Sequence, residues 1–135
     1  MCKLMNAFCT YCSAEKSKEP GKLPAIKLYK SSRIEQVYAA ASLLRLGFYI
    51  LSGKFGLLSA EQRIECYDQL LVPSQVGDMV DKLAEQIEEQ GVTGITYFTK
   101  PLASDPKVRP YHDALAAACS RTSRPFSVVE LDLRD

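Results

Sequence analysis

Tryptophan is absent from the 135-residue sequence and histidine occurs once. No run of about 18 apolar residues exists, so we expect no membrane-spanning helix and no membrane partner. The catalytic patterns G-x-S-x-G and H-E-x-x-H and the dinucleotide fingerprint G-x-G-x-x-G are also missing, which argues against the reaction classes that use them. The N-terminal segment MCKLMNAFCTYCSAEK is too short and too polar for a signal peptide, and we therefore expect a cytoplasmic protein.

A strong excess of either charge is lacking as well. The 17 basic and 16 acidic residues give a net charge of +1, which argues against tight, sequence-independent binding of duplex nucleic acid. The charge is unevenly distributed, since residues 1–54 hold nine basic and three acidic side chains and residues 55–135 hold eight basic and thirteen acidic ones. This asymmetry favours an anionic partner for the first part of the chain, although two ordinary solvated faces would explain it too.

The length and the order of the apolar segments predict one domain over residues 1–135. Strands are expected at residues 4–9, 48–52, 92–99 and 126–131, and helices from Ser32 to Gly47, from about 74 to 90, and from Pro110 onward. Ser32 and Glu35 fit a capping box, and Gly47 suits the end of the first helix. This alternation predicts an α/β fold with a largely parallel sheet of about four strands and helices on both faces.

Ligands of such sheets bind outside the carboxyl ends of the strands. The segments expected there are residues 10–31, 52–60 and 99–110. Residues 16–33 contain six basic side chains opposed by Glu19 alone, and Ser31 and Arg33 stand at the start of the first helix, where free amides favour an anion. A phosphate site is one interpretation, and a solvated loop with an ordinary helix cap is the other.

Two further clusters are candidates for chemistry. Residues 53–56 (GKFG) follow a strand, so their amides can form an anion-binding nest beside Ser52 and Lys54, or only a tight turn. Glu65 and Asp68 flank Tyr67, and either carboxylate could act as a general base or stabilise positive charge on a sugar ring. The alternative is two surface acids beside a packed tyrosine.

The five cysteines are an odd number, which favours reduced thiols over a disulfide framework. Cys9 and Cys12 have C-x-x-C spacing, but no helix follows directly, as a redox site would need, and no second ligand pair is available for zinc. We therefore expect no metal and no cofactor, while a redox or metal role of this pair stays open.

Four motifs carry a resemblance to a known family: Cys12-Ser13-x-x-Lys16, Leu28-Tyr29-x-Ser31, the run ILSGKFGLL at residues 50–58, and Glu65-x-Tyr67-Asp68-x-x-Leu71. They resemble the pattern C-S-x-x-K, L-Y-x-S, I-L-S-A-K-x-G-L and E-P-Y-D of small bacterial, archaeal and phage domains of unknown function. That family is similar in turn to YaaA-like proteins and to accessory domains of archaeosine transglycosylases. The resemblance covers residues 8 to about 71.

The resemblance implies an α/β fold and an association with nucleic acids, modified bases or nucleotides, without an assigned reaction. Gly53 replaces the usual alanine of the pattern, which we expect to matter little. Cys66 replaces proline, which changes the expected shape of that turn. The motif residues that transfer as site candidates are Cys12, Ser13, Lys16, Tyr29, Ser31, Ser52, Lys54, Gly56, Glu65, Tyr67 and Asp68.

Three functions follow as hypotheses. The first is an enzyme that acts on a nucleoside or nucleotide by cleaving or exchanging its N-glycosidic bond. In it Lys16, Ser31, Arg33 and Lys54 hold a phosphate, Tyr29 or Tyr67 stacks on the base, and Glu65 or Asp68 is catalytic. The second is a non-catalytic binder of a nucleotide or of nucleic acid, and the third is a structural or adaptor module that could form a dimer.

Overall fold

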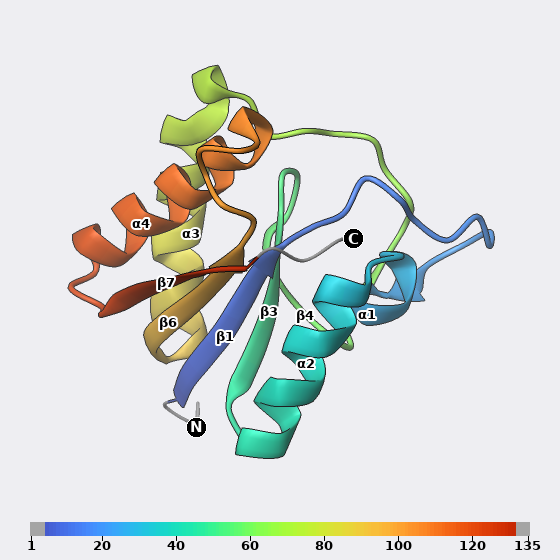
Figure 1. The fold of residues 1–135 in the computed structure, drawn as a ribbon, viewed down its shortest axis with the longest axis horizontal. Coiled ribbons are helices and arrows are strands. Elements are labelled where there is room, and N and C mark those ends of the chain that lie inside the picture. Colours follow the sequence, from blue (N-terminus) through green and yellow to red (C-terminus); the bar gives the residue numbers. More distant parts are fainter. Residues whose placement is uncertain (1–4, 132–135) are drawn as a thin grey trace.

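A five-stranded sheet in the order β4-β3-β1-β6-β7 forms the centre of the computed structural model, which describes residues 5–131 (Figure 1). The strands are β1 (Met5–Tyr11), β2 (Leu23–Pro24), β3 (Gly47–Ser52), β4 (Gly56–Ser59), β5 (Arg63–Ile64), β6 (Val92–Thr99) and β7 (Phe126–Glu130). Strands β3, β1, β6 and β7 are parallel, β4 runs antiparallel to β3, and β2 pairs with β5 in a separate two-stranded sheet. The predicted α/β class with a largely parallel sheet is confirmed.

The helices are α1 (Ala25–Leu28), α2 (Ser32–Leu44), α3 (Val76–Gln90) and α4 (Arg109–Arg121). Helices α3 and α4 pack against one face of the sheet, and α2 packs against β1 and β3 on the other (Figure 1). Two 3-10 turns, Pro73–Gln75 and Pro106–Val108, lead into α3 and α4. No helix within residues 5–131 has both the length and the apolar character needed to cross a membrane.

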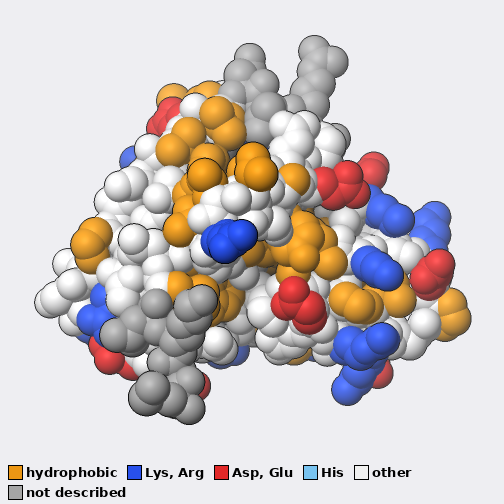
Figure 2. Space-filling view, turned by 90° about the horizontal axis from the view of Figure 1, so that it is seen from below, with side chains coloured by type: hydrophobic (Ala, Val, Ile, Leu, Met, Phe, Trp, Pro, Cys, Tyr) orange, Lys and Arg blue, Asp and Glu red, His pale blue; other side chains and the backbone are white. Residues whose placement is uncertain are grey.

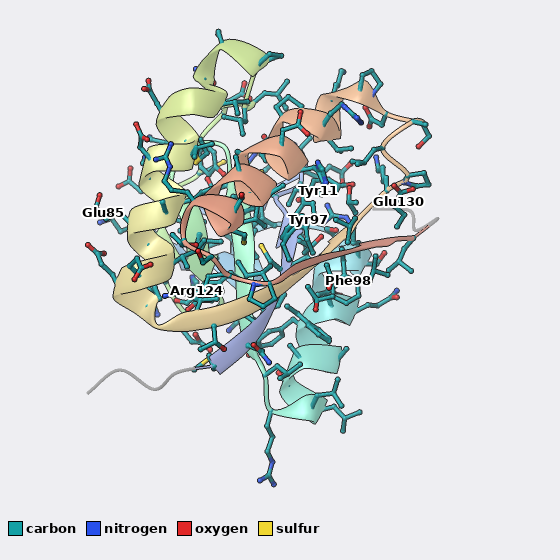
Figure 3. All side chains as sticks on the ribbon, turned by 90° about the vertical axis from the view of Figure 1, so that its left-hand side faces the viewer. Tyr11, Glu85, Tyr97, Phe98, Arg124 and Glu130 are labelled. Carbon is teal, nitrogen blue, oxygen red and sulfur yellow. The ribbon has the colours of Figure 1, made fainter. Side chains whose placement is uncertain are left out.

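Each face of the sheet has its own apolar core because side chains of a strand alternate between the two faces. On β1, Ala7, Cys9 and Tyr11 belong to the core beneath α3 and α4, whereas Phe8 packs against the core beneath α2. Figure 3 shows the same alternation on β6, where Tyr97 lies under α4 with Tyr11, and Phe98 lies on the α2 side.

The ends of α2 differ from the prediction by one or two residues. Ser31, and not Ser32, is the N-cap, because its Oγ accepts a hydrogen bond from the Ile34 amide at 3.2 Å. Arg45, with φ of 58°, supplies the left-handed residue that ends the helix. Gly47, predicted for that role, is already the first residue of β3, so the sheet begins earlier than the apolar run suggests.

Other predicted boundaries agree closely with the structure. Strand β6 spans the predicted residues, α3 ends at Gly91 with φ of 68°, and β7 begins at Phe126 as expected. The helix predicted from Pro110 begins one residue earlier, because the turn at Pro106–Val108 leads directly into it. Leu4, predicted to begin the first strand, lies outside the described residues.

The segment predicted as a tight glycine turn is a β-hairpin formed by β3 and β4. Gly56 takes φ of 75° at the start of β4, where the Gln86 side chain accepts from the Leu57 amide at 2.8 Å and donates to the Phe55 carbonyl at 2.9 Å. This hairpin adds the fifth strand. The two-residue strands β2 and β5 and the short helix α1 were not expected either, since their sequences have no periodicity.

The replacement of alanine by Gly53 was expected to matter little, but the structure has no room for a Cβ atom at this position. A Cβ atom at this position would lie 2.8 Å from the Gln69 carbonyl oxygen and 2.9 Å from the Leu71 amide nitrogen. Such distances are shorter than van der Waals contact, and both neighbours are backbone atoms that cannot move independently. Gly53 therefore lets residues 69–71 pass close over the hairpin.

The loops that follow the parallel strands lie together at one end of the molecule. In Figure 1 the green segment that leads from β5 to α3 passes across this end, beside the blue loop that follows β1. The molecule seen from below (Figure 2) presents a central band of hydrophobic side chains with Lys, Arg, Asp and Glu mixed around it. Because open α/β sheets bind ligands outside the carboxyl ends of their strands, the loops at that end are the part of the molecule in which site residues are expected.

Candidate functional site

Tyr67 is the centre of a hydrogen-bond network at the carboxyl end of β3. Its hydroxyl lies 2.5 Å from the Tyr29 hydroxyl and 2.6 Å from Ser52 Oγ. Ser52 Oγ also accepts hydrogen bonds from the Lys54 amide at 3.1 Å and the Phe55 amide at 3.0 Å. Ser52 Oγ thus joins the turn between β3 and β4 to the Tyr67 hydroxyl, and in each of the two hydroxyl pairs either oxygen can be the donor.

Two lysine ammonium groups lie near the ring of Tyr67. Lys16 Nζ is 4.9 Å from the Tyr67 ring centroid and 5.8 Å from that of Tyr29, and Lys54 Nζ is 5.9 Å from the Tyr67 ring centroid. Lys16 reaches this position because it forms a β-bridge with Tyr29. Within residues 5–131 no carboxylate lies within ion-pair distance of Lys16 or Lys54. Both charges are therefore available to an anion.

Burial raises the pKa of the Tyr29 and Tyr67 hydroxyls well above the ordinary value, with the nearby Cys12 thiol as the second cause. The same causes, in the same order, raise the pKa of Tyr111, whose hydroxyl accepts from the Cys12 thiol at 3.8 Å and from the Leu71 amide at 3.0 Å. These phenols are neutral at physiological pH. They can donate or accept hydrogen bonds but do not supply a phenolate nucleophile.

A large open cavity, here called the loop cavity, is formed by residues 14–21, Lys30 and residues 65–68, with a volume of about 1060 Å³. Its basic side chains are Lys16, Lys18 and Lys30, and its acidic ones are Glu15, Glu19, Glu65 and Asp68. Glu65 and Asp68 are exposed, so water and salt screen their charges. Tyr67 is half-buried and is the only aromatic residue among the lining residues.

A second pocket, here called the switch-point pocket, lies between the ends of β1 and β6 and has a volume of about 310 Å³. Residues 11–14 and Lys16 form one wall, residues 68–70 the second, and Lys100, Asp105, Lys107, Val108 and Tyr111 the third. Ala14, Lys16 and Asp68 line both this pocket and the loop cavity. The two spaces are therefore neighbours that share these three residues as a common wall.

The structure brings together most of the predicted site residues. Lys16, Glu65, Tyr67 and Asp68 line the loop cavity, and Cys12 and Ser13 line the switch-point pocket together with Lys16 and Asp68. Tyr29 and Ser52 connect to this group through the Tyr67 hydroxyl. Their roles toward a ligand stay predictions.

Arg33 was expected to contact a phosphate, and the structure corrects this. Its side chain is only 1% exposed, and its guanidinium donates to Thr10 Oγ1 at 2.5 Å and to the Tyr11 carbonyl at 2.7 Å. The guanidinium carbon also lies 3.6 Å from the Tyr11 ring centroid. Arg33 thus connects α2 to the end of β1. Ser31 is likewise buried, and its hydroxyl caps α2.

Two further expectations at this end of the sheet are corrected. The Lys54 and Phe55 amides, expected to be free for an anion-binding nest that included Gly56, are hydrogen-bonded to Ser52 Oγ. The Lys54 side chain lines a separate small pocket beside α3. Tyr29 is 1% exposed and presents no ring face on which a base could stack, so the structure removes it as a stacking candidate.

Lys100, Asp105, Lys107 and Tyr111 were not named as candidates from the sequence. They come from the loop between β6 and α4 and from the first turn of α4. The position of residues 99–110 after a predicted strand was the available signal, but that segment carries no motif.

The two cysteines of the C-x-x-C pair lie in different environments. Cys9 is fully buried in the core beneath α3 and α4, where burial raises the pKa of its thiol, whereas Cys12 is half-buried and borders the switch-point pocket. Within residues 5–131, no three His, Cys, Asp or Glu side chains lie close enough together to hold a metal ion.

The fold and these cavities define a small α/β protein with a polar cavity at the carboxyl ends of its parallel strands. The chain belongs to DUF6884, a family of unknown function, whose pattern matches residues 10–127. The matched range spans the residues of the four motifs, and the similarity of those motifs to YaaA-like proteins and to archaeosine transglycosylase domains stays a prediction. No curated protein and no solved structure matches the chain significantly.

Proposed function

We propose that the protein binds a nucleotide in the loop cavity, with its phosphate at Lys16. The observation that carries the proposal is the position of Lys16, which borders both the loop cavity and the switch-point pocket and has no carboxylate partner within residues 5–131. Within residues 5–131, the one hydrogen bond of its ammonium group is a long one of 3.5 Å to the Ala14 carbonyl. An ammonium group in this state gains most from a charge-assisted bond to phosphate.

The mixture of side chains in the loop cavity favours a nucleotide over a bare polyphosphate. Lys16, Lys18 and Lys30 attract a phosphate, but Glu65 and Asp68 would repel a second one. Carboxylates are the usual acceptors for ribose hydroxyls in nucleotide sites. Tyr67 adds an aromatic face. The phosphate and the sugar of a nucleotide use these groups, with the ring of Tyr67 packed against the sugar. The YaaA-like resemblance points to the same ligand class.

Binding is tested by isothermal titration calorimetry with a panel of nucleoside mono- and diphosphates. We expect at least one to bind, and Lys16→Gln to weaken it by about tenfold or more, as loss of one charge-assisted hydrogen bond implies. The matched control is Lys27→Gln, because Lys27 is an exposed lysine of α1 that lines neither space. A panel without binding, or equal effects of the two variants, would contradict the proposal.

A second candidate is cleavage or exchange of the N-glycosidic bond. It is favoured by Asp68, which lines both spaces and so lies beside any sugar attached to a phosphate at Lys16. Incubation with the bound nucleotide, followed by chromatography for free base, tests it. Asp68→Asn and Glu65→Gln should abolish release while nucleotide binding persists.

The remaining alternatives are read from the same measurements. Binding without release of base identifies a non-catalytic nucleotide-binding module, and a duplex oligonucleotide added to the panel tests nucleic-acid binding. Absence of binding to the whole panel would leave the adaptor hypothesis, for which light scattering would determine whether the chain forms a dimer.

A further inference from the structure

The switch-point pocket lies where the order of the strands reverses. From β1 the chain goes to β3 on one side, and after β4 it crosses over to β6 on the other side of β1. The helical connections leave the adjacent carboxyl ends of β1 and β6 on opposite faces of the sheet, which opens a crevice between them. Open α/β sheets bind ligands at this position. No residue of the β6–α4 connection has a role in the proposed function so far.

The inner wall of the pocket combines apolar surface with the hydroxyl of Tyr111. Tyr11 and Val108 are buried, and Leu70 is half exposed at the rim. The Tyr111 hydroxyl accepts from the Leu71 amide at 3.0 Å and from the Cys12 thiol at 3.8 Å. Since both of these bonds use its lone pairs, the Tyr111 proton remains available to a ligand in the pocket. Figure 3 shows Tyr11 on the α4 side of the sheet, where this wall stands.

The outer wall is held in place by Asp105. Its carboxylate forms an ion pair with Lys100 at 3.5 Å and accepts from the Lys107 amide at 3.0 Å. The Lys107 ammonium forms no ion pair within residues 5–131. The wall therefore combines an ordered loop with one uncompensated positive charge, which suits the electronegative edge of a heterocycle.

We infer that the switch-point pocket holds the base of the nucleotide whose phosphate lies at Lys16. This inference rests on the proposed function. A volume of about 310 Å³ is at the lower end of the range for small-molecule sites and admits a planar base with its sugar at the mouth. The edge of the base faces the inner wall and accepts a hydrogen bond from the Tyr111 hydroxyl, an arrangement that needs no stacking on the buried Tyr111 ring. Lys16 and Asp68, shared by the two spaces, lie beside the phosphate and the sugar.

Cys12 provides a direct test because it lines the switch-point pocket and not the loop cavity. In a Cys2→Ser, Cys66→Ser protein, Cys9 and Cys119 remain buried, so Cys12 is the thiol open to iodoacetamide. The rate of Cys12 alkylation is measured by mass spectrometry without ligand, with saturating ribose 5-phosphate, and with the nucleotide that binds best. We expect the nucleotide to slow alkylation by about tenfold or more, as the occupied fraction of the site dictates, and ribose 5-phosphate to leave the rate unchanged.

The outcomes separate this inference from the proposed function. Calorimetric nucleotide binding that depends on Lys16, together with equal alkylation rates with and without nucleotide, would place the base elsewhere and overturn only the subsite. Equal protection by ribose 5-phosphate would do the same. Failure of Cys12 to react in the free protein would indicate a pocket that is closed to small molecules, and would also overturn the base subsite alone. Absence of nucleotide binding overturns both.

Tyr111→Phe is the second test. It removes the hydroxyl and keeps the ring, and we expect nucleotide affinity to fall by about tenfold while ribose 5-phosphate affinity is unchanged. Because the Leu71 amide also loses its acceptor, thermal unfolding must confirm that the variant is folded. Equal losses for the two ligands in a folded variant would contradict the base subsite.

Discussion

The hydroxyl of Tyr67 lies 2.5 Å from the hydroxyl of Tyr29, although the two residues come from different loops. Tyr29 follows α1, and Tyr67 belongs to the irregular segment between β5 and α3. Their rings meet edge to face at 6.4 Å between centroids. Through this contact and its hydrogen bond to Ser52, Tyr67 connects the wall of the loop cavity to the end of β3.

Tyr67→Phe should therefore destabilise the protein by about 1–2 kcal/mol, because Tyr29 and Ser52 each lose a partner in a partly buried network. The free energy of unfolding is measured by urea denaturation. Tyr38→Phe is the matched control: Tyr38 is half-buried against Phe48, and its hydroxyl makes no hydrogen bond within residues 5–131. Equal effects of the two substitutions would show that the network adds nothing to stability.

Arg33→Met should cost about 2–4 kcal/mol, since the buried guanidinium that joins α2 to β1 is lost and the Tyr11 carbonyl loses a charged donor. Methionine retains much of the side-chain volume, so the loss reports mainly on the polar contacts. Arg109→Met, at an exposed position of α4, should change the free energy of unfolding by less than about 0.5 kcal/mol. Similar urea midpoints for the two variants would refute the structural role of Arg33.

Gly53→Ala should lower the stability of the protein, whereas Gly77→Ala should raise it. At Gly53 the new methyl group meets backbone atoms at 2.8 and 2.9 Å, and forcing residues 69–71 away should cost about 1–3 kcal/mol. At Gly77, within α3, a Cβ meets nothing within 4 Å, and alanine should stabilise the helix by about 0.5–1 kcal/mol. The melting temperatures of the two variants, compared with that of the wild type, test both predictions. An unchanged melting temperature for Gly53→Ala would show that residues 69–71 move away at little cost.

Stability should fall at alkaline pH. Burial raises the pKa of Tyr29, Tyr67, Tyr97 and Tyr111 above their unfolded value near 10, and raises the pKa of Cys119 to about 11 from 9.0. The folded state thus keeps protons that the unfolded chain releases. This contribution is complete below about pH 8, begins to fall as the pH passes the unfolded values of about 9 and 10, and continues to fall until the raised folded pKa values are passed, near pH 11 for Cys119.

The free energy of unfolding from urea titrations at several pH values measures that loss. Tyr67→Phe should show a shallower decline, because one of the responsible groups is gone. Absorbance at 295 nm provides the control: fewer than the seven tyrosines should ionise before the protein unfolds. A complete tyrosine titration near pH 10 in folded protein would contradict the burial of these groups.

Local sequence patterns were sufficient to predict the α/β alternation and the largely parallel sheet. These follow from local patterns: α3 shows its apolar residues at helical spacing, β6 is rich in β-branched and aromatic residues, and Gly91 ends the helix between them. The motif residues Lys16 and Tyr67 were also identifiable, because they fall in loops that parallel topology brings to one end of the sheet.

Which of these polar residues face a cavity depends on tertiary packing and could not be predicted from the sequence. Lys16 and Arg33 both belong to the basic stretch after β1, yet Lys16 borders two cavities and Arg33 is buried against Tyr11. Likewise, Gly53 can be judged only once residues 69–71 are seen to pass over it. Burial and long-range contact depend on the packing of segments far apart in the chain, and no local pattern around Arg33, Gly53 or Tyr111 encodes the neighbours that packing gives them.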